Sequence, residues 1–300
     1  TNVSAPTLII EGKNNMSADL HLHTTASDGS FTPSELVEKA SRLGLRAIAI
    51  TDHDSLGGIA EALKAGREMG ITVIPGIELS SEYEDCDHCS CDFHFLGYFI
   101  DHRSPWLHRH LERLRRARFQ RAYEMVKRLQ LGGISIPFEE VKEIANNGSL
   151  GRPHIARVLV QHGYADTIQA AFNKYLQRRS PYYVEKFTYT PAEVIEVIRR
   201  AGGIAGLAHP GVCKCDGKIP EFVAAGLKAL EVYHTDHNSS QVNRYKRLAK
   251  KLGLVRTGGS DCHGPISLRG YLLGSVTVAD EVVEQLRELA GLKKQRAERV

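Results

Sequence analysis

The stretch ADLHLHTTASDGSFTPSELVEKASRLGLRAIAITDHD, residues 18–54, decides the fold class of this 300-residue chain. Two short apolar runs, each typical of a buried strand, flank one amphipathic segment. That segment has the signals of a helix start, because Thr32 can cap it, Pro33 suits its first turn and Glu35 completes a capping box. Gly44 ends it. The order strand, helix, strand predicts a parallel sheet or barrel rather than a β-sandwich.

The same alternation continues on both sides of a helical interruption. Apolar strands are predicted in TVIPGIELS, DFHFLGYFI, GIAGLAHPG, ALEVYHTD and LVRTGGSDCHG. The interruption consists of consecutive amphipathic helices, the longest with an apolar stripe from Leu111 to Leu129. We therefore expect an α/β fold with three parts: a main domain from residues 16–102 and 187–300, a helical insertion or cap at 103–186, and an N-terminal extension at 1–15.

The composition is that of a soluble globular protein, with 42% hydrophobic and 25% charged residues. No apolar run approaches the ~20 residues of a membrane helix, and the N-terminal residues lack a signal-peptide pattern. We expect a cytoplasmic protein with no membrane partner and no obligate protein partner. The net charge of +4 does not by itself indicate nucleic-acid binding. Basic residues concentrate in residues 103–130, either as a solvated helix face or as a rim that attracts an anionic substrate.

The six cysteines form two groups and one single residue: Cys86, Cys89 and Cys91, then Cys213 and Cys215, then Cys262. A disulfide framework is not expected in a chain of this length without secretion signals. A zinc clip that joins the two groups is one interpretation. Reduced thiols in surface loops are the preferred one, because no CxxC pair recurs with zinc-finger spacing.

Histidines and carboxylates recur at the ends of the predicted strands, in HLH, TDHD, GIELS, LAHPG, EVYH and GSDCH. In a parallel βα barrel the C-terminal strand ends form one face, so these side chains should converge. His94 stands near the start of its strand, which is explained if that strand runs in the opposite sense. Side chains at i and i+2 share a strand face, so His21 should point with His23, and Asp261 with His263. Imidazole and carboxylate ligands together favour Zn, Mn or Fe in the +2 state.

The runs DLHLHTTASDGS, ITDHDS, GIELS, HFLGY, AHPG and GSDCHG together resemble the motifs of the PHP family, named for polymerase and histidinol phosphatase. The resemblance spans residues 18–264 and implies a distorted (β/α)7 TIM-like barrel with two or three divalent metal ions, manganese, iron or zinc. Within the family, the chain is similar to the branch that acts on nucleotide 3′,5′-bisphosphates and on RNA from its 5′ end. The run GRPHIA, residues 151–156, is also similar to that branch.

The resemblance also implies which residues hold the metals. A first ion would take His21, His23, Glu78 and Asp261. A second would share Glu78 and add His94 and His209. A third would take Asp28, His53 and His263. Asp28 stands where some relatives have histidine, which we expect to alter the third site.

Shared carboxylates at such a site predict a metal-bridging hydroxide that attacks phosphorus. The leading hypothesis is a metal-dependent phosphoesterase that removes the 3′-phosphate of nucleotide 3′,5′-bisphosphates and also acts on short 5′-phosphorylated RNA. The alternatives are a phosphatase of a small metabolite such as histidinol phosphate, a non-catalytic metal-binding or interaction module, and a redox-sensing or zinc-stapled protein built on the cysteines.

Other residues have two interpretations each. Arg152 either grips a substrate phosphate, as the resemblance favours, or is an exposed arginine at a helix start. His234 either contacts phosphate and protonates the leaving oxygen or hydrogen-bonds to a ligand. Asp52 and Asp54 are expected to orient imidazoles. Helix packing is expected for His154. Three tyrosines could stack a base, although packing is the commoner role: Tyr182, Tyr183 and Tyr189.

Overall fold

The computed structural model describes residues 17–84, 90–145, 150–185, 187, 189–213, 215–265 and 270–292. Cys86, His88 and Cys89, on which the zinc-clip interpretation partly rests, lie outside these residues, as does the side chain of Cys91.

Strands follow the predicted alternation, and all belong to one sheet in the order β7-β6-β5-β4-β3-β2-β1-β8. β4 runs antiparallel to β3 and β5, and β8 antiparallel to β1, while the remaining neighbours are parallel. The reversed direction predicted from His94 is therefore confirmed. The bounds are β1 Ser17–Leu22, β2 Ala47–Ile50, β3 Thr72–Glu84, β4 Ser90–Tyr98, β5 Ile204–Leu207, β6 Ala229–His234, β7 Val255–Gly259 and β8 Val278–Ala279.

The sheet closes on itself where β7 meets β1. Leu22 forms a parallel bridge with Cys262, and the amide of His23 donates to the Cys262 carbonyl at 3.1 Å. A Cβ atom at Gly259 would lie 2.4 Å from the His21 amide nitrogen, so only glycine allows this approach. The predicted distorted α/β barrel is confirmed, with short β8 as an eighth strand.

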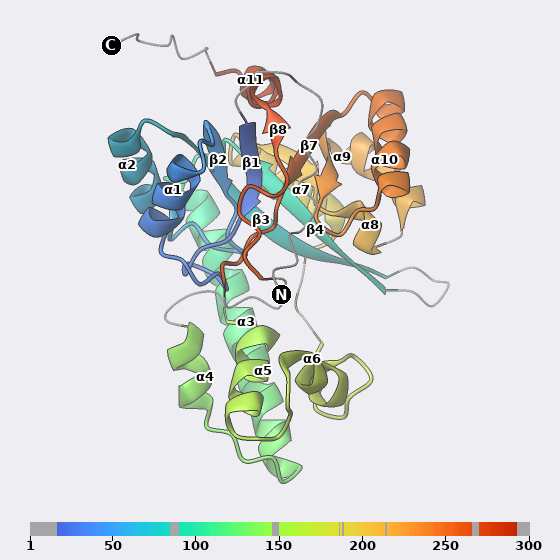
Figure 1. Ribbon diagram of the computed structural model, residues 1–300. Helices are drawn as coiled ribbons and strands as arrows, with labels where there is room; N and C mark the ends of the chain where they lie inside the picture. Colours follow the sequence, from blue (N-terminus) through green and yellow to red (C-terminus); the bar gives the residue numbers. More distant parts are fainter. Residues whose placement is uncertain are drawn as a thin grey trace.

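Helices surround the barrel (Figure 1). The capping box predicted for the first helix is present, since the Thr32 amide donates to the Glu35 carboxylate at 2.8 Å and the Glu35 amide to the Thr32 hydroxyl at 3.2 Å. None of the helices in the described part of the chain is long and apolar enough to cross a membrane. Those around the barrel are α1 Pro33–Arg42, α2 Ile59–Met69, α7 Pro191–Arg200, α8 Pro210–Cys213, η2 Asp216–Lys218, α9 Ile219–Ala225, α10 Ser239–Leu252 and α11 Asp280–Leu289.

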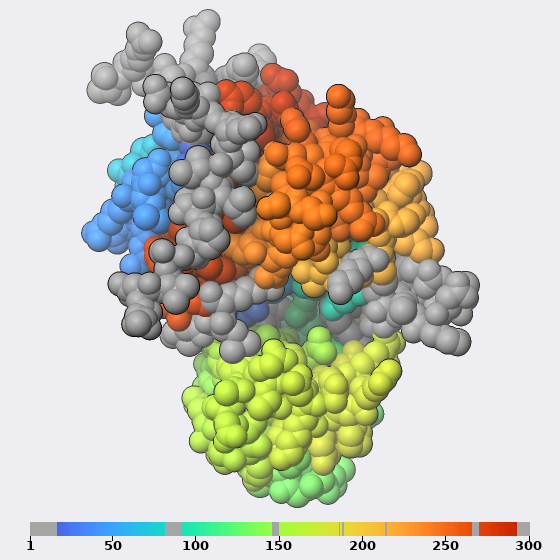
Figure 2. Space-filling model, turned by 45° about the vertical axis from the view of Figure 1, so that its right-hand side comes forward, coloured from blue at the N-terminus to red at the C-terminus, as the bar shows by residue number. Residues whose placement is uncertain are grey.

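A second group of helices lies between β4 and β5 in the sequence: α3 Pro105–Leu131, α4 Phe138–Ala145, α5 Arg152–Gln161, α6 Ile168–Ala171 and the π-helical η1 Phe172–Leu176. α3 has two halves with different partners. Leu107 and Leu111 pack into the core between the barrel and its helices, whereas Met125 and Leu129 pack into a separate core with α4, α5 and η1. We call the second half of α3 with α4, α5, α6 and η1 the helical lobe. It projects below the barrel, with a hollow between the two (Figure 2).

Candidate metal centre

Four predicted ligands lie together at the end of the barrel formed by the C-terminal ends of β1 and β7. The Nε2 atoms of His21 and His23 both lie 3.2 Å from Oε2 of Glu78, and 3.4 and 3.1 Å from Oδ1 of Asp261. All four residues are buried. Ligand atoms of a tetrahedral ion with ~2.0–2.2 Å bonds lie roughly 3.3–3.6 Å apart. The two nitrogens and two oxygens therefore have nearly the spacing of one first coordination shell.

Glu78 connects this group to the rest of the site through its second oxygen. Its Oε1 atom lies 2.8 Å from Nδ1 of His94 and 3.2 Å from Nε2 of His209. Antiparallel pairing of β3 with β4 brings His94 beside Ser80, two residues after Glu78 on the same face of β3. One carboxylate thus faces histidines of both predicted groups, the arrangement required of a bridging ligand.

A third group forms at the mouth of the barrel. Asp28 Oδ1 lies 3.3 Å from Nε2 of His263 and 3.8 Å from Nδ1 of His23. His53 has a ligand atom close enough to join this group, but its Nδ1 atom is also 3.2 Å from Oε2 of Glu78. His53 therefore lies between the groups. All nine predicted ligands lie in one continuous cluster.

Backbone geometry fixes several of these residues. His53 pairs with Glu78 in an isolated parallel bridge, and the Glu78 carbonyl accepts the Asp54 amide at 3.0 Å. His209 and Asp261 both have positive φ angles, 26° and 52°. Such angles are costly for residues other than glycine and persist at functional sites because the surroundings impose them.

Buried atoms without hydrogen bonds show that this cluster fits a cation. Among the described residues, His23 Nε2, His53 Nδ1 and Asp28 Oδ1 are buried and have no hydrogen-bond partner. Buried polar atoms are normally satisfied, because an unpaired one costs about 1–3 kcal/mol. A metal ion supplies the missing partner, and the mixed nitrogen and oxygen donors suit a divalent transition metal.

The charges of the cluster lead to the same conclusion. Burial opposes ionisation of Glu78, Asp261 and Asp28, yet the surrounding histidines hold the pKa of each carboxyl well below its usual value. Burial likewise disfavours a charged His21 or His23, but the carboxylates raise the pKa of both, that of His23 to about 10. The metal-free cluster thus keeps these carboxylates ionised and holds protons on His21 and His23, where metal ions would supply the positive charge.

The structure adds Glu231, which sequence reasoning missed. This carboxylate is fully buried in β6; its Oε1 atom lies 3.0 Å from Nδ1 of His21, and its Oε2 accepts the His209 amide at 2.7 Å. It fixes the orientation of one candidate ligand and the backbone of another. The only signal in the sequence was a glutamate inside the apolar run ALEVYH.

Asp52 and Asp54 do not orient imidazoles, so that prediction is wrong. Asp52 accepts hydrogen bonds from the Thr24 amide and hydroxyl, both at 2.7 Å, and from the Ser27 hydroxyl at 2.6 Å. Asp54 pairs with Arg118 of α3. The prediction assumed strand alternation, but β2 ends at Ile50 and these aspartates lie in the loop that follows.

His234 is buried at the end of β6. Its Nδ1 accepts the Asp236 amide at 3.1 Å, and its Nε2 lies 3.4 Å from Oδ2 of Asp261. This Nε2 atom has no hydrogen-bond partner among the described residues, so His234 stays available for either predicted role. His154 is also buried, and its Nδ1 accepts the Gly151 amide at 3.0 Å, so it caps and packs α5 as expected.

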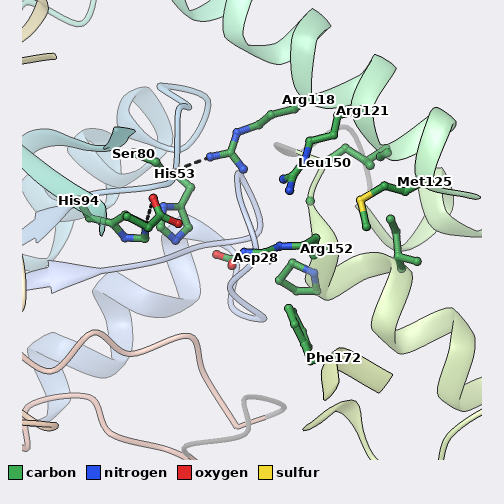
Figure 3. A pocket seen from close by; sticks show the side chains of 15 residues that line it. Asp28, His53, Ser80, His94, Arg118, Arg121, Met125, Leu150, Arg152 and Phe172 are labelled. Atoms are coloured by element: carbon green, nitrogen blue, oxygen red, sulfur yellow. Dashed lines mark hydrogen bonds and ion pairs between the residues drawn. The ribbon is translucent and has the colours of Figure 1, made fainter. Parts of the chain in front are cut away.

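A pocket opens from the cluster toward the helical lobe (Figure 3). Asp28, His53 and His94 line one side, and Arg118, Arg121 and Arg152 line the other. In Figure 3 the Arg152 side chain extends from α5 toward Asp28. The pocket therefore has candidate metal ligands at one end, the ionised Asp28 among them, and guanidinium groups at the other.

The arginines differ in how they are held. Arg118 pairs with Asp54 and donates to the Ser80 hydroxyl at 3.4 Å. Arg152 donates a long hydrogen bond, 3.4 Å, to the Leu176 carbonyl, and its guanidinium lies over the rings of Phe172 and Tyr183 at 5.7 and 5.9 Å. No carboxylate in the described ranges pairs with it. Arg152 thus retains charge and donors for an anion.

The remaining predicted residues pack or lie apart from the pocket. Tyr182 and Tyr183 pack against the core of the lobe, and Tyr189 packs against the barrel core. Cys213 donates to a backbone carbonyl, and burial raises the pKa of its thiol to about 12. Cys215 is disulfide-bonded, which differs from the expected reduced thiol.

The chain matches the PHP domain family over residues 19–255. It is 36% identical over 253 residues to a 5′-3′ exoribonuclease of Haemophilus influenzae, an alignment that covers 82% of this chain and 90% of that protein. It is 33% identical over 253 residues to a 3′,5′-nucleoside bisphosphate phosphatase of Chromobacterium violaceum, covering 82% and 87%. A crystal structure from Bifidobacterium adolescentis, assigned to the metal-dependent phosphoesterases, superposes with a TM-score of 0.82 at 32% identity, covering 92% and 96% of the two chains.

The barrel, the histidine and carboxylate cluster and these similarities define the class: the protein is a metal-dependent phosphoesterase, a hydrolase. The chain belongs to the PHP family, as its motifs predicted.

Proposed function

We propose that the cluster holds two or three divalent ions, manganese, iron or zinc. His21, His23, Glu78 and Asp261 would bind the first, and Glu78 would bridge to a second held by His94 and His209. Asp28, His53 and His263 would bind the third. The contacts of Glu78 support this division, because its two oxygens face different histidines. Bound ions of this kind lower the pKa of a water and neutralise phosphoryl oxygens.

The substrate is a phosphomonoester, most specifically the 3′-phosphate of a nucleotide 3′,5′-bisphosphate. One observation carries this proposal: the pocket has candidate metal ligands at one end and arginines at the other. Such a pocket matches a molecule with two separate phosphates, one at the cluster and one at Arg152. Guanidinium groups recognise phosphate through paired hydrogen bonds. Short 5′-phosphorylated RNA carries two phosphates at the same separation at its 5′ end; its 3′-linked phosphate is a diester, so hydrolysis there would release a mononucleotide and the shortened strand.

The chain's own side chains have distinct tasks in this reaction. Arg152 binds the phosphate that is not hydrolysed and sets the distance between it and the cluster. The pair Arg118–Asp54 fixes α3 against the loop that carries His53, so the pocket keeps its width. His234 holds the Asp261 carboxylate in orientation from the buried side. Contact between His234 and the leaving oxygen would require a shift of this buried ring, so we assign it the positioning role.

A substrate panel tests the proposal. With metal-loaded protein, phosphate release is measured from adenosine 3′,5′-bisphosphate, adenosine 3′-monophosphate, AMP and histidinol phosphate, and release of AMP is measured from a 5′-phosphorylated oligoadenylate, whose phosphodiester hydrolysis frees no inorganic phosphate. The bisphosphate should exceed AMP in kcat/KM, because AMP lacks the 3′-phosphate that is hydrolysed, and should exceed adenosine 3′-monophosphate, because that compound lacks the phosphate held by Arg152. Arg152→Gln should raise KM for the bisphosphate and leave hydrolysis of adenosine 3′-monophosphate nearly unchanged, because that compound lacks the phosphate that Arg152 binds. A clear preference for histidinol phosphate would replace this proposal with the small-metabolite alternative, and activity that survives complete metal removal would refute the metal-dependent reaction.

The non-catalytic alternative has less support. A metal-binding module without activity needs no pocket beside its ions, whereas here the cluster opens onto a pocket lined by three arginines. Retention of bound metal without hydrolysis of any member of the panel would favour that alternative.

A further inference from the structure

His209, the candidate ligand that faces Oε1 of Glu78, lacks the support that a metal-binding imidazole normally has. Its Nε2 atom lies 3.2 Å from the Glu78 carboxylate. Its Nδ1 atom is buried and has no hydrogen-bond partner among the described residues. The second nitrogen of a metal-binding histidine normally donates to a carboxylate or a backbone carbonyl, and that bond orients the ring. The orientation of the His209 ring therefore depends on its backbone.

The backbone at His209 has a conformation that its neighbours must impose. Its φ angle of 26° is costly for any residue other than glycine. On the N-terminal side, the His209 amide donates to Oε2 of Glu231 at 2.7 Å. On the C-terminal side, Pro210 has no amide hydrogen to donate. The next amide that can fix this turn belongs to Gly211.

Two side chains from the start of α10 and the loop before it hold Gly211. The Gly211 amide donates to Nε2 of His237 at 3.0 Å, and the Gly211 carbonyl accepts from Nε2 of Gln241 at 3.3 Å. Gly211 and His237 are both buried. A Cβ atom at residue 211 would lie 2.6 Å from Cδ2 of His237 and 2.6 Å from Nε2 of Gln241, so both side chains lie directly against this glycine. We call His237 and Gln241 the Gly211 clamp.

Each side chain of the Gly211 clamp is itself fixed in the role that it has. Nδ1 of His237 donates to the Val232 carbonyl at 2.9 Å, which leaves the lone pair on Nε2 to accept. Burial lowers the pKa of His237, so the ring is neutral at neutral pH. Oε1 of Gln241 accepts the Asn238 amide at 2.9 Å in the capping box of α10, so its Nε2 is the atom turned toward Gly211. Both polar groups of Gly211 therefore meet preorganised partners.

We propose that the Gly211 clamp positions His209 for the second ion. Neither His237 nor Gln241 belongs to a group of candidate ligands, so both act through the backbone of residues 209–211. Their hydrogen bonds hold the turn in which His209 has its positive φ angle, and this turn brings the imidazole to Glu78. The inference rests on the proposed metal centre and adds two positioning residues that decide whether the second site fills.

Manganese binding to two variants tests the proposal. His237→Phe keeps an aromatic ring but leaves the buried Gly211 amide without an acceptor. Gln241→Glu keeps an oxygen for the capping box but places the other carboxylate oxygen against the Gly211 carbonyl. Each variant should weaken binding of the second ion by about 10–100-fold, the usual effect of removing a group that orients a ligand. Elemental analysis after dialysis should then show about one ion fewer per chain, and the electron paramagnetic resonance signal of ions coupled through Glu78 should be lost.

Two further variants separate positioning from a general loss of packing. His237→Gln retains an acceptor near the position of Nε2 and should restore the coupled signal. His110→Phe is the matched control, because it removes a histidine whose Nδ1 bonds to the Trp106 carbonyl on α3, and it should keep the full metal content. Gln241 is only partly buried, so Gln241→Glu decides the question if His237→Phe does not fold. Unchanged metal content in the variants that fold, or an equal loss of every ion, would overturn the inference.

Failure of the metal centre itself has a different signature. If wild-type protein shows no coupled ions, the proposed division of the cluster fails. The Gly211 clamp is then judged from the imidazole ¹⁵N resonances of the metal-free protein. A shift of the His209 resonances in His237→Phe and Gln241→Glu, but not in His237→Gln, supports the positioning role. Resonances of His209 that stay unchanged, or that shift equally in all three variants, overturn it.

Discussion

Glu231 lies in contact with His21 across 210 positions of sequence, with its Oε1 atom 3.0 Å from Nδ1 of the imidazole. The opposite nitrogen of the same ring faces Glu78 and Asp261. A carboxylate that accepts from Nδ1 fixes the tautomer with a free Nε2 lone pair, the form that a metal requires. Glu231 therefore prepares His21 for metal binding although it faces away from the proposed ion.

Replacement of Glu231 by glutamine should weaken metal binding by about 10–100-fold, the usual effect of removing such a partner. The amide preserves the size of the side chain but removes the charge that holds the Nδ1 proton. Competition with a chromogenic chelator measures the change. Glu68→Gln, at an exposed position of α2, is the matched control. Unchanged metal affinity together with a lower Tm would show that Glu231 only supports packing.

Asp28 should serve a different ion from the one held by His21 and the Nε2 atom of His23. Its closest histidine contact is with His263, at 3.3 Å, at the outer edge of the cluster. Asp28→Ala should therefore lower the metal content by about one ion per chain and spare the others, as measured by elemental analysis after dialysis. Asp166→Ala, exposed on the lobe, should retain the full content. Loss of every ion from the Asp28 variant would mean that the groups are not separable.

The sequence predicted which histidines and carboxylates cluster, because local rules apply to many of them. Two-residue spacing brought His21 and His23 together, and the position of His94 near a strand start indicated the reversed β4. The role of Glu231 was not predicted, because its partner His21 lies across the barrel interior and residue spacing does not predict contacts between distant strands. A buried glutamate within an apolar strand was the only sign of it.

The sequence also did not predict the contacts made by loops or the surfaces at which helices pack. The prediction for Asp52 and Asp54 assumed that side chains continue to alternate as in a strand, although β2 ends at Ile50. Asp54 has a φ of 49°, and its side chain pairs with Arg118 of α3. The apolar stripe predicted α3, but periodicity alone could not show that its two halves join different cores. Both outcomes depend on which surfaces meet in the folded chain.

Arg118→Met should destabilise the protein by about 3–5 kcal/mol, the typical effect of leaving one member of a buried ion pair without its partner. Asp54 is buried, so its carboxylate cannot regain full hydration. Urea unfolding of metal-saturated protein measures the change. The double variant Arg118→Met with Asp54→Asn should recover most of the lost stability, because the unpaired charge is removed. A double variant as unstable as the single one would contradict this account.

Metal binding should strengthen as pH rises through the neutral range. In the metal-free protein the carboxylates raise the pKa of His23 to about 10, above its ordinary value near 6.5, so a bound ion must displace a proton. The raised pKa of His23 also stabilises the metal-free fold. This stabilisation is complete at pH values below the ordinary histidine pKa, and it is lost as the pH rises toward about 10. As the pH rises, metal binding becomes stronger and the metal-free fold becomes less stable. The gain in Tm on addition of manganese should therefore grow with pH across this window. Calorimetry in buffers of different ionisation enthalpy should show proton release on binding, and a His23→Gln variant should release fewer protons. Affinity that is constant or falls with rising pH would show that the histidines are already neutral before the metal binds.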